Sequence, residues 1–220
     1  MTKEELEILY EDNHIIVVYK PANILSQSDI TGDKDMLTLL KEYIKEKYNK
    51  PGNVYLGLVH RLDRPVQGIM VYAKTSKAAA RLSEQIRKNE LSKHYLAVIN
   101  GTMVEKKGVF KDYLVKDTNG NTSVTDKEHG KESILNYEVL DEKNNYSLVR
   151  IELITGRHHQ IRVQFAHRGY PLVGDNRYGK CENMPICLCS YQLSFYHPIT
   201  KELLQFEKMP QKNDIWKLFY

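Results

Sequence analysis

Short apolar segments rich in β-branched and aromatic residues recur along the whole chain, and turn residues separate them. Such segments are typical of strands in a partly buried sheet. The segments that we expect to be strands are 14–19, 70–73, 93–99, 133–140, 146–153, 188–196 and 203–208. Three stretches are expected to be helices: 36–48, 76–89 and 158–167. We therefore expect an α+β fold, a mostly antiparallel mixed sheet with packed helices, in a single domain spanning residues 1–220.

The composition of the chain is that of an ordinary globular protein. Of its 220 residues, 41% are hydrophobic and 27% are charged. No apolar run approaches the roughly 20 residues of a membrane-spanning helix, and residues 1–5 lack the apolar segment of a secretory signal. An odd number of cysteines suggests reduced thiols at Cys181, Cys187 and Cys189. We therefore expect a cytoplasmic protein that does not enter the membrane.

The net charge of +4 is modest, but basic residues gather in two segments. Lysines and arginines outnumber acidic residues in 74–93 and again in 150–180, whereas acidic residues gather in 1–12 and 112–142. Concentrated positive charge favours a polyanionic partner, and nucleic acid is the simplest such partner. The alternative is a solvated surface of mixed charge. Charge alone leaves both interpretations open.

The segment 58–68 sets one carboxylate, Asp63, between two guanidinium groups, Arg61 and Arg64. Apolar residues precede and follow it, so we expect a strand, a short loop with the charged cluster, and a second strand. Neighbouring positive charge favours the ionised form of a carboxyl group. An ionised carboxylate on a rigid turn can serve as a nucleophile, a base or an electrostatic partner. The alternative is a structural Arg–Asp ion pair that caps a surface turn.

Other common kinds of site find little support in the sequence. The histidines and cysteines lack the spacing of a zinc site, so we expect no metal. The Gly-x-Ser-x-Gly elbow of a serine hydrolase and a phosphate-binding loop are absent as well. A retaining glycosidase would need two catalytic carboxylates, and only Asp63 has a suggestive context. This pattern favours chemistry at a glycosidic bond that needs a single carboxylate.

Two later segments contain residues that suit RNA chemistry, although each has a plainer explanation. Lys93 and Tyr95 project from the same face of a strand because side chains alternate. Tyr95 can stack on a base or pack in the core. Arg162 can bind phosphate, pair with Asp63 or remain solvated. Taken singly, Tyr95 is expected in the core and Arg162 in solvent.

Taken together and in order, these segments resemble the RluA-type pseudouridine synthase family. The resemblance runs from about Ile8 to Phe206. It rests on the opening Glu11-Asp12 with Lys20-Pro21-Ala22 and on four ordered motifs: His60-Arg61-Leu62-Asp63, Lys93-x-Tyr95-x-Ala97, Thr155-Gly156-Arg157-x-His159-Gln160-Ile161-Arg162, and Gly169-x-Pro171-x-x-Gly174-Asp175-x-x-Tyr178-Gly179. Any one motif would be a weak signal, whereas four in the family's order make a strong one.

The resemblance implies an RNA pseudouridine synthase, an isomerase acting on uridine in ribosomal or transfer RNA. The C1′–N1 bond breaks, the uracil rotates, and C5 joins C1′. Asp63 matches the family's catalytic aspartate, Tyr95 the tyrosine that stacks on the uracil, and Arg162 the basic residue that pairs with the aspartate. Isomerisation needs no redox change and no external donor, so we expect no cofactor.

The resemblance also implies residues that bind the substrate. Arg61 matches the arginine that helps to displace the target base in the family, and a base inside an RNA helix must be flipped out to be reached. Further substrate contacts are expected from the neighbouring motif residues His60, Lys93 and Arg157. A monomer would suffice for this chemistry.

The chain departs from the family pattern at three places. Val66-Gln67-Gly68 replaces the usual Thr-Ser-Gly or Val-Ser-Gly, so the hydrogen bonding of the loop must differ. Asn23 stands where the family usually has glycine, and asparagine tolerates the same left-handed backbone region. About ten residues precede the first motif, so we expect no N-terminal S4 domain.

Two other functions remain as alternatives at this point. The first is a catalytically silent RNA-binding protein on the same fold, which would not need Asp63, Tyr95 and Arg162 together. The second is a nucleoside or sugar hydrolase that uses Asp63, and the basic segments argue against it. The sequence does not specify which RNA or which uridine would be modified, or whether Asp63 would attack C1′ or remove a ribose proton.

Overall fold

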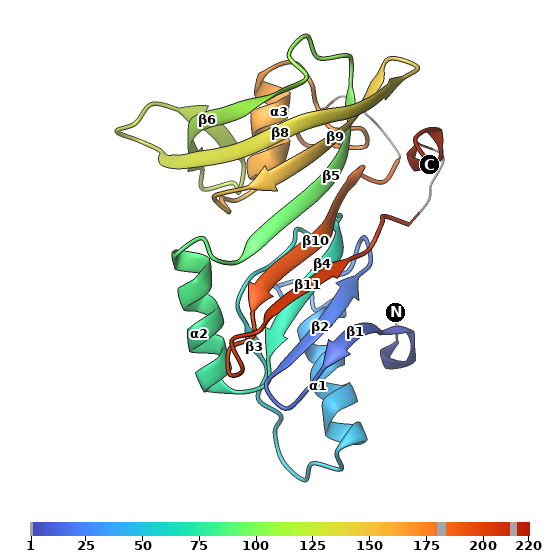
Figure 1. Ribbon diagram of the computed structural model, residues 1–220, viewed down its shortest axis with the longest axis vertical. Coiled ribbons are helices and arrows are strands. Elements are labelled where there is room, and N and C mark those ends of the chain that lie inside the picture. Colours follow the sequence, from blue (N-terminus) through green and yellow to red (C-terminus); the bar gives the residue numbers. More distant parts are fainter. Residues whose placement is uncertain (1, 180–183, 212–214) are drawn as a thin grey trace. The chain divides into compact units, whose positions relative to one another are not determined.

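The computed structural model describes residues 2–179, 184–211 and 215–220 (Figure 1). Cys181 lies outside these residues, and Cys187 and Cys189 are buried. Among the described residues there is no helix with the length and apolar character needed to cross a membrane.

The chain divides into two compact units. The first comprises Met1–Leu91 and Gln192–Lys208, and the second comprises Ser92–Tyr191 and Met209–Tyr220. Each unit contains antiparallel strands with α-helices packed on them. The expected α+β fold with a mixed sheet is therefore confirmed.

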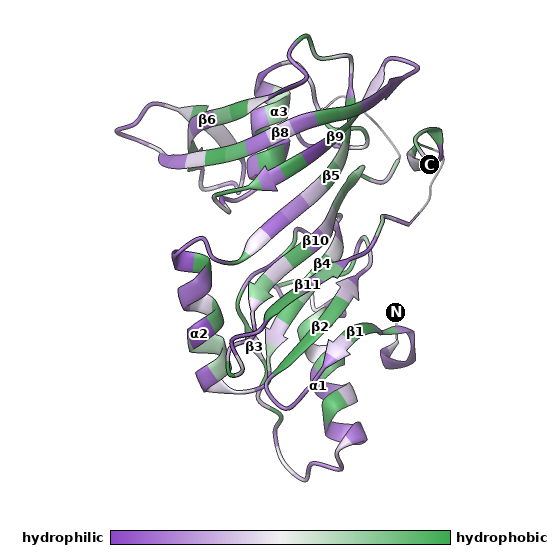
Figure 2. Cartoon of the chain, in the orientation of Figure 1, coloured by the Kyte–Doolittle hydropathy of each residue, from purple (hydrophilic) through white to green (hydrophobic). Residues whose placement is uncertain are grey.

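The sheet of the first unit is built around two buried strands, β2 (Ile15–Lys20) and β4 (Gln67–Ala73). Figure 2 shows β2 mostly in the green of hydrophobic residues. Strand β2 lies between β1 (Glu7–Glu11) and β4, and every residue of β2 and β4 is buried. Burial on both faces explains why these strands are continuous apolar runs and do not alternate. Further pairs in the described part of this unit include β3 (Gly57–Leu58) with β4, and β11 (Leu203–Glu207) with the second half of β10 (Leu188–Tyr196).

Helices α1 (Met36–Lys47) and α2 (Ser76–Arg87) begin and end where side-chain chemistry favours it. The side chains of Asp35 and Thr75 accept hydrogen bonds from the main-chain N–H three residues on, at 3.0 and 3.1 Å. Soon after each helix comes an asparagine with positive φ, Asn49 or Asn89. Both helices therefore lie close to the expected ranges. A short 3-10 helix, Lys3–Glu5, precedes β1.

Glu11, at the end of β1, ties this strand to α1 and β4. Its carboxylate oxygens lie 2.7 Å from the Nζ atoms of both Lys47 and Lys74, and the hydroxyls of Tyr43 and Tyr48 donate to it at 3.1 and 2.9 Å. Burial alone would raise the pKa of Glu11, but the hydrogen bonds from Lys47, Lys74 and Tyr48 outweigh it and lower the pKa to about 2. The ionised carboxylate therefore stabilises the fold.

We expect Glu11→Gln to lower the free energy of unfolding at pH 7 by about 2 to 3 kcal/mol. Because the pKa of Glu11 is lowered in the folded state, its contribution is fully present above the ordinary value of 4.5 and is lost as the pH falls toward 2. Urea denaturation at several pH values measures this. The difference in the free energy of unfolding between wild type and variant should shrink as the pH falls below 4.5 and be nearly lost at pH 2. A constant difference from pH 7 to pH 2 would contradict the prediction.

The second unit has an antiparallel sheet whose strands are not in sequence order. The order is β5 (Ser92–Asn100), β9 (Tyr146–Leu153), β8 (Lys131–Lys143), β6 (Lys107–Lys116) and β7 (Thr122–Thr125). Helix α3 (Gln160–His167) packs against β6 and β7. In the aromatic cluster beside it, the ring centroid of Phe110 lies 4.5 Å from that of Tyr137 and 5.0 Å from that of Phe165. Strand β6 was not expected, because its many polar residues and Gly108 hide the strand pattern. A second 3-10 helix covers Trp216–Leu218.

Candidate active site

Asp63 lies on a tight turn between β3 and β4. The N–H of Val66 donates to the carbonyl oxygen of Asp63 at 3.0 Å and closes the turn. Arg61 is exposed, Leu62 is buried and Asp63 is half-buried. The expected strand, loop and strand are therefore present, although the first strand has only two residues. This arrangement holds the main chain of Asp63 and leaves part of its side chain open to solvent.

Arg64 is paired with a carboxylate that the sequence did not reveal. Its Nη1 lies 2.7 Å from Oδ2 of Asp33, in the loop that precedes α1, and both side chains are about half exposed. The sequence suggested instead that both neighbouring arginines would serve Asp63. The Arg64–Asp33 pair connects the Asp63 turn to the loop before α1.

Lys20 places a buried amino group against the main chain of the Asp63 turn. The residue is 0% exposed, and its Nζ donates to the carbonyl oxygens of Pro21, Ile24 and Arg64 at 3.0, 2.6 and 3.1 Å. Burial lowers the pKa of Lys20 to about 7, although the negative charge of Asp63 acts in the opposite direction. Lys20 thus places a buried amino group, charged only in part at neutral pH, near Asp63 and fixes the main chain after it.

Gln67 stands at the position where the family pattern has a serine, and its side chain makes a different hydrogen bond. Gln67 is buried, and its Oε1 accepts a hydrogen bond from the Tyr19 hydroxyl at 2.7 Å. The Nε2 atom of His60, before the turn, accepts from the N–H of Val71 at 3.0 Å. Asn23 has φ 67°, as expected for a residue that replaces glycine. Gln67 is therefore held by a contact with β2, and Asn23 by its own backbone preference.

In the second unit, β5 carries Tyr95 and Lys93 on one face. Tyr95 is 7% exposed and lies opposite Ile151 of β9. Lys93 is half-buried near Gly156, and burial lowers the pKa of its ammonium group. Because its pKa is lowered, Lys93 loses its proton more readily than an ordinary surface lysine does.

Arg162, on α3, is not in solvent, and the expectation based on this residue alone was wrong. It is 6% exposed, and its Nε and Nη2 donate to the two carboxylate oxygens of Asp175 at 2.8 and 2.7 Å. Asp175 is 1% exposed and also accepts from the N–H groups of Arg177 and Tyr178. Although burial acts to raise it, the pKa of Asp175 is lowered by Arg162 and these N–H groups. The pair fixes the direction of the guanidinium group.

The loop that follows α3 supports this pair. Gly174 has φ 77°, and a Cβ atom there would lie 2.2 Å from the carbonyl oxygen of Pro185, so the close approach requires glycine. The ring of Tyr178 lies 5.2 Å from Cζ of Arg162, and its hydroxyl lies 2.7 Å from Nδ1 of His159. His159 itself has φ 51° at the start of α3. The residue at the start of α3 and the loop that follows the helix therefore hold Tyr178 and Asp175 against Arg162.

The remaining predicted residues of this unit lie near the start of α3. Arg157 is exposed, and its Nε donates to the carbonyl oxygen of Glu132 at 3.0 Å. His158 stacks on His159, with ring centroids 3.7 Å apart, and its Nδ1 lies 2.8 Å from Oγ1 of Thr122. In the described part of the chain, no group of three or more His, Cys, Asp or Glu side chains could hold a metal ion.

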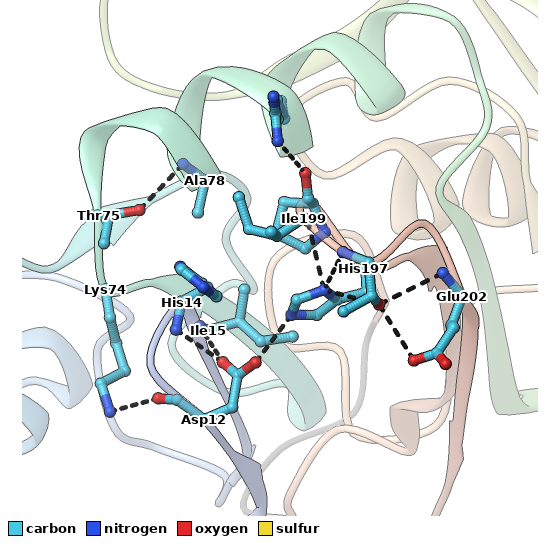
Figure 3. Close-up of polar contacts among 12 residues, drawn as sticks. Asp12, His14, Ile15, Lys74, Thr75, Ala78, His197, Ile199 and Glu202 are labelled. Carbon is cyan, nitrogen blue, oxygen red and sulfur yellow. Dashed lines mark hydrogen bonds and ion pairs between the residues drawn. The ribbon is translucent and has the colours of Figure 1, made fainter.

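A second cluster of titratable groups, in the first unit, has the composition of a catalytic dyad (Figure 3). His197 is 2% exposed, and its Nε2 lies 2.9 Å from Oδ2 of Asp12. The other ring nitrogen accepts from the N–H groups of Ile199 and Thr200 at 3.3 and 2.9 Å, so Nε2 carries the proton. Asp12 also accepts from the N–H of Ile15 at 2.8 Å. With both ring nitrogens hydrogen-bonded within the fold and the side chain buried, the pair joins two turns, and we assign it a structural role.

Sequence reasoning assigned no role to four residues that the structure places around the predicted site residues. Lys20 and Ser26 anchor the Asp63 turn, and Asp175 and Tyr178 surround Arg162. Lys20, Asp175 and Tyr178 lie in motifs that carried the family resemblance, which was the available signal. Ser26 lies in none of the motifs.

Comparison with known proteins gives the family. The family model for RNA pseudouridylate synthase matches residues 14–167. YhcT of Bacillus subtilis, named as an uncharacterized RNA pseudouridine synthase, is 36% identical over 205 residues, which are 91% of this chain and 67% of that protein. The dual-specificity RNA pseudouridine synthase RluA of Pasteurella multocida is 33% identical over 216 residues, 95% of either chain.

Two further comparisons concern substrate names and fold. The ribosomal large subunit pseudouridine synthase D of Haemophilus influenzae is 32% identical over 219 residues, 91% of this chain and 66% of that protein. The structure of human RNA pseudouridylate synthase domain containing 4 superposes with a TM-score of 0.78 at 21% identity, covering 96% of this chain and 90% of the other. The human structure supports the fold alone.

The chain belongs to the RNA pseudouridylate synthase family, whose members are isomerases. Its relatives include RluA itself, so the resemblance to the RluA type is confirmed.

Proposed function

We propose that this isomerase converts uridine to pseudouridine in ribosomal or transfer RNA, and that Asp63, Tyr95 and Arg162 are its catalytic residues. The observation that carries the proposal is the Asp63 turn, in which a half-buried carboxylate stands on a main chain that is fixed by the N–H of Val66 and by the buried amino group of Lys20. Such pre-organisation suits a group that must meet a reacting atom in one geometry. The names of the relatives that act on ribosomal RNA support the substrate class.

The reaction rearranges bonds within one nucleotide. The C1′–N1 bond breaks, a C1′–C5 bond forms, the proton on C5 leaves and N1 gains a proton, so no oxidant, reductant or cofactor is consumed. Asp63 supplies an ionised carboxylate at the sugar, whether it attacks C1′ or removes a ribose proton. Arg162 supplies a guanidinium group that stays protonated and that Asp175 holds in one direction. Tyr95 supplies a ring for the flipped uracil.

The substrate contacts that we propose come from basic side chains at the predicted motifs. Arg61 is exposed beside Asp63, and an arginine can fill the space that a flipped base leaves or bind a phosphate. His60, Lys93 and Arg157 are proposed as the neighbouring contacts to RNA. We further propose that residues 1–220 act as one catalytic domain, as a monomer in the cytoplasm.

The test of this function is pseudouridine mapping across total RNA. Cells that lack the gene are compared with cells in which it is restored as wild type or as Asp63→Ala. We expect at least one site in ribosomal or transfer RNA to disappear on deletion and to return with wild type only. A map that does not change on deletion would reject the proposed function, and return of the site with Asp63→Ala would reject the role of Asp63.

We expect Tyr95→Phe to lower the rate of pseudouridine formation by about 10- to 100-fold while RNA affinity stays within about threefold. The phenyl ring keeps the stacking surface, whereas the hydroxyl that can assist loss of the C5 proton is gone. Single-turnover rates and filter binding with RNA from cells lacking the gene measure the two quantities. Tyr137→Phe is a matched control, because Tyr137 is a tyrosine of the same unit that is 7% exposed, as Tyr95 is, and its hydroxyl donates to the carbonyl oxygen of Glu105 at 3.3 Å. Equal turnover of Tyr95→Phe and wild type would contradict the role of Tyr95.

A further inference from the structure

A serine outside the family motifs holds the residue that precedes Asp63. Ser26 lies in the loop between β2 and α1 and is 5% exposed. Its hydroxyl donates to the carbonyl oxygen of Leu62 at 2.7 Å and accepts from the N–H of Leu62 at 3.1 Å. One side chain therefore satisfies both main-chain groups of Leu62, which is itself buried.

Arg64, the residue that follows Asp63, is held by a side chain from the same segment of the chain, 20–26. The carbonyl oxygen of Arg64 accepts from Nζ of Lys20 at 3.1 Å. Asp63 thus stands between two residues, Leu62 and Arg64, whose main-chain groups are bound to side chains from the segment 20–26. Because both neighbours are fixed, the Cα of Asp63 has little freedom to move, and its side chain is aimed by the main chain.

Ser26 is in turn fixed by the strand that follows the turn. Its carbonyl oxygen accepts from the hydroxyl of Tyr72 at 3.1 Å, and Tyr72 is completely buried in β4. The Sδ of Met70 lies 3.6 Å from the Ser26 hydroxyl. The serine is therefore connected to both sides of the Asp63 turn, to Leu62 before it and to β4 after it. These hydrogen bonds connect three separate segments of the chain: the loop of Ser26, the turn of Leu62 and Asp63, and strand β4.

We propose that Ser26 is a positioning residue that sets the location of the Asp63 carboxylate for the reaction at C1′; this inference rests on the proposed function. Ser26 acts through the main chain of Leu62, without touching the substrate. A misplacement of about 1 Å in a reacting group costs about 100-fold in rate. The serine therefore affects the chemical step more than the binding of RNA.

Ser26→Ala is the direct test, with total RNA from cells lacking the gene as the substrate. We expect kcat for pseudouridine formation to fall by about 10- to 100-fold while KM changes by less than about threefold. Hydrogen exchange should show faster exchange at the amide of Leu62, which loses its acceptor. Ser26→Thr keeps the hydroxyl and should retain kcat within about fivefold of wild type. If Ser26→Thr is active and Ser26→Ala is not, the loss of activity comes from the missing hydroxyl and not from misfolding.

Ser147→Ala is the matched control, because Ser147 is a buried serine of the second unit whose hydroxyl donates to the carbonyl oxygen of Gly101 at 2.7 Å. Both Ser147→Ala and Ser26→Ala should lower the thermal midpoint of unfolding, because each loses a buried hydrogen bond, whereas Ser147→Ala should leave kcat within about twofold of wild type. The inference is overturned if Ser26→Ala and Ser147→Ala have the same kcat, or if Ser26→Ala raises KM alone. Failure of the proposed function is a different outcome, in which the wild type forms no pseudouridine although the Leu62 amide still depends on Ser26.

Discussion

Asp63→Asn is expected to lower the rate of pseudouridine formation by about 10⁴-fold or more and to leave RNA affinity within about threefold. Asparagine has nearly the same shape as aspartate, so the turn closed by Val66 and anchored at Leu62 is preserved. The amide can neither attack C1′ nor accept a ribose proton effectively, so the chemical step is lost. Single-turnover rates, with filter binding on the same RNA, measure both quantities.

The matched control is Asp33→Asn, which removes the carboxylate that pairs with Arg64 near the same turn. Because that pair is about half exposed, we expect a change of no more than about threefold in rate. Full activity of Asp63→Asn would show that the carboxylate is not catalytic. If the cellular effect of the protein survives Asp63→Asn although turnover is gone, the silent RNA-binding function is the better account. Release of free uracil would instead indicate a hydrolase.

Asp175→Asn is expected to lower the free energy of unfolding by about 3 to 5 kcal/mol, the usual cost of leaving a buried charge without its partner. The variant removes the charge that neutralises Arg162, and both residues are less than one-tenth exposed. The folded pKa of Asp175 is lowered, so its contribution is present above the ordinary value of 3.8 and is lost only as the pH falls below it. Urea denaturation at pH 7 and pH 3 should therefore show a larger difference at pH 7.

Asp112→Asn is a suitable control, since Asp112 makes the same two-pronged contact with Arg168, at 2.9 and 3.0 Å, but is more exposed. We expect Asp112→Asn to lower the free energy of unfolding by about 1 kcal/mol. The double variant Arg162→Met with Asp175→Leu should recover part of the stability, because no buried charge remains, but it should not recover turnover. Recovery of turnover would exclude a catalytic role for Arg162, and equal losses in Asp175→Asn and Asp112→Asn would contradict the importance of burial.

The sequence was most informative where the deciding interactions are local. Helices α1 and α2 have capping residues and helical spacing within a dozen residues, and their bounds lie close to those expected. Strands β2 and β4 are buried on both faces, so their apolar runs could be recognised directly. The positive φ of Asn23 also follows from a property of the residue itself.

Where a contact joins distant segments, local pattern could not supply it. Strand β6 is half-exposed, so its sequence has no clear alternation, and pairing with β8 decides its conformation. Arg162 resembles any solvent-facing arginine on a helix until the loop after α3 places Asp175 against it. Both are cases in which tertiary context overrides the preference of the segment.

By itself, therefore, the sequence determined the α+β class, the principal strands and helices, and the identity of the candidate residues Asp63, Tyr95 and Arg162 through the order of their motifs. Only the tertiary structure decided what fixes two of them. Ser26 reaches Leu62 across 36 residues, and Arg162 reaches Asp175 across 13. Hydrogen bonds of this kind depend on distance and direction in space, and the sequence specifies those only after the chain has folded.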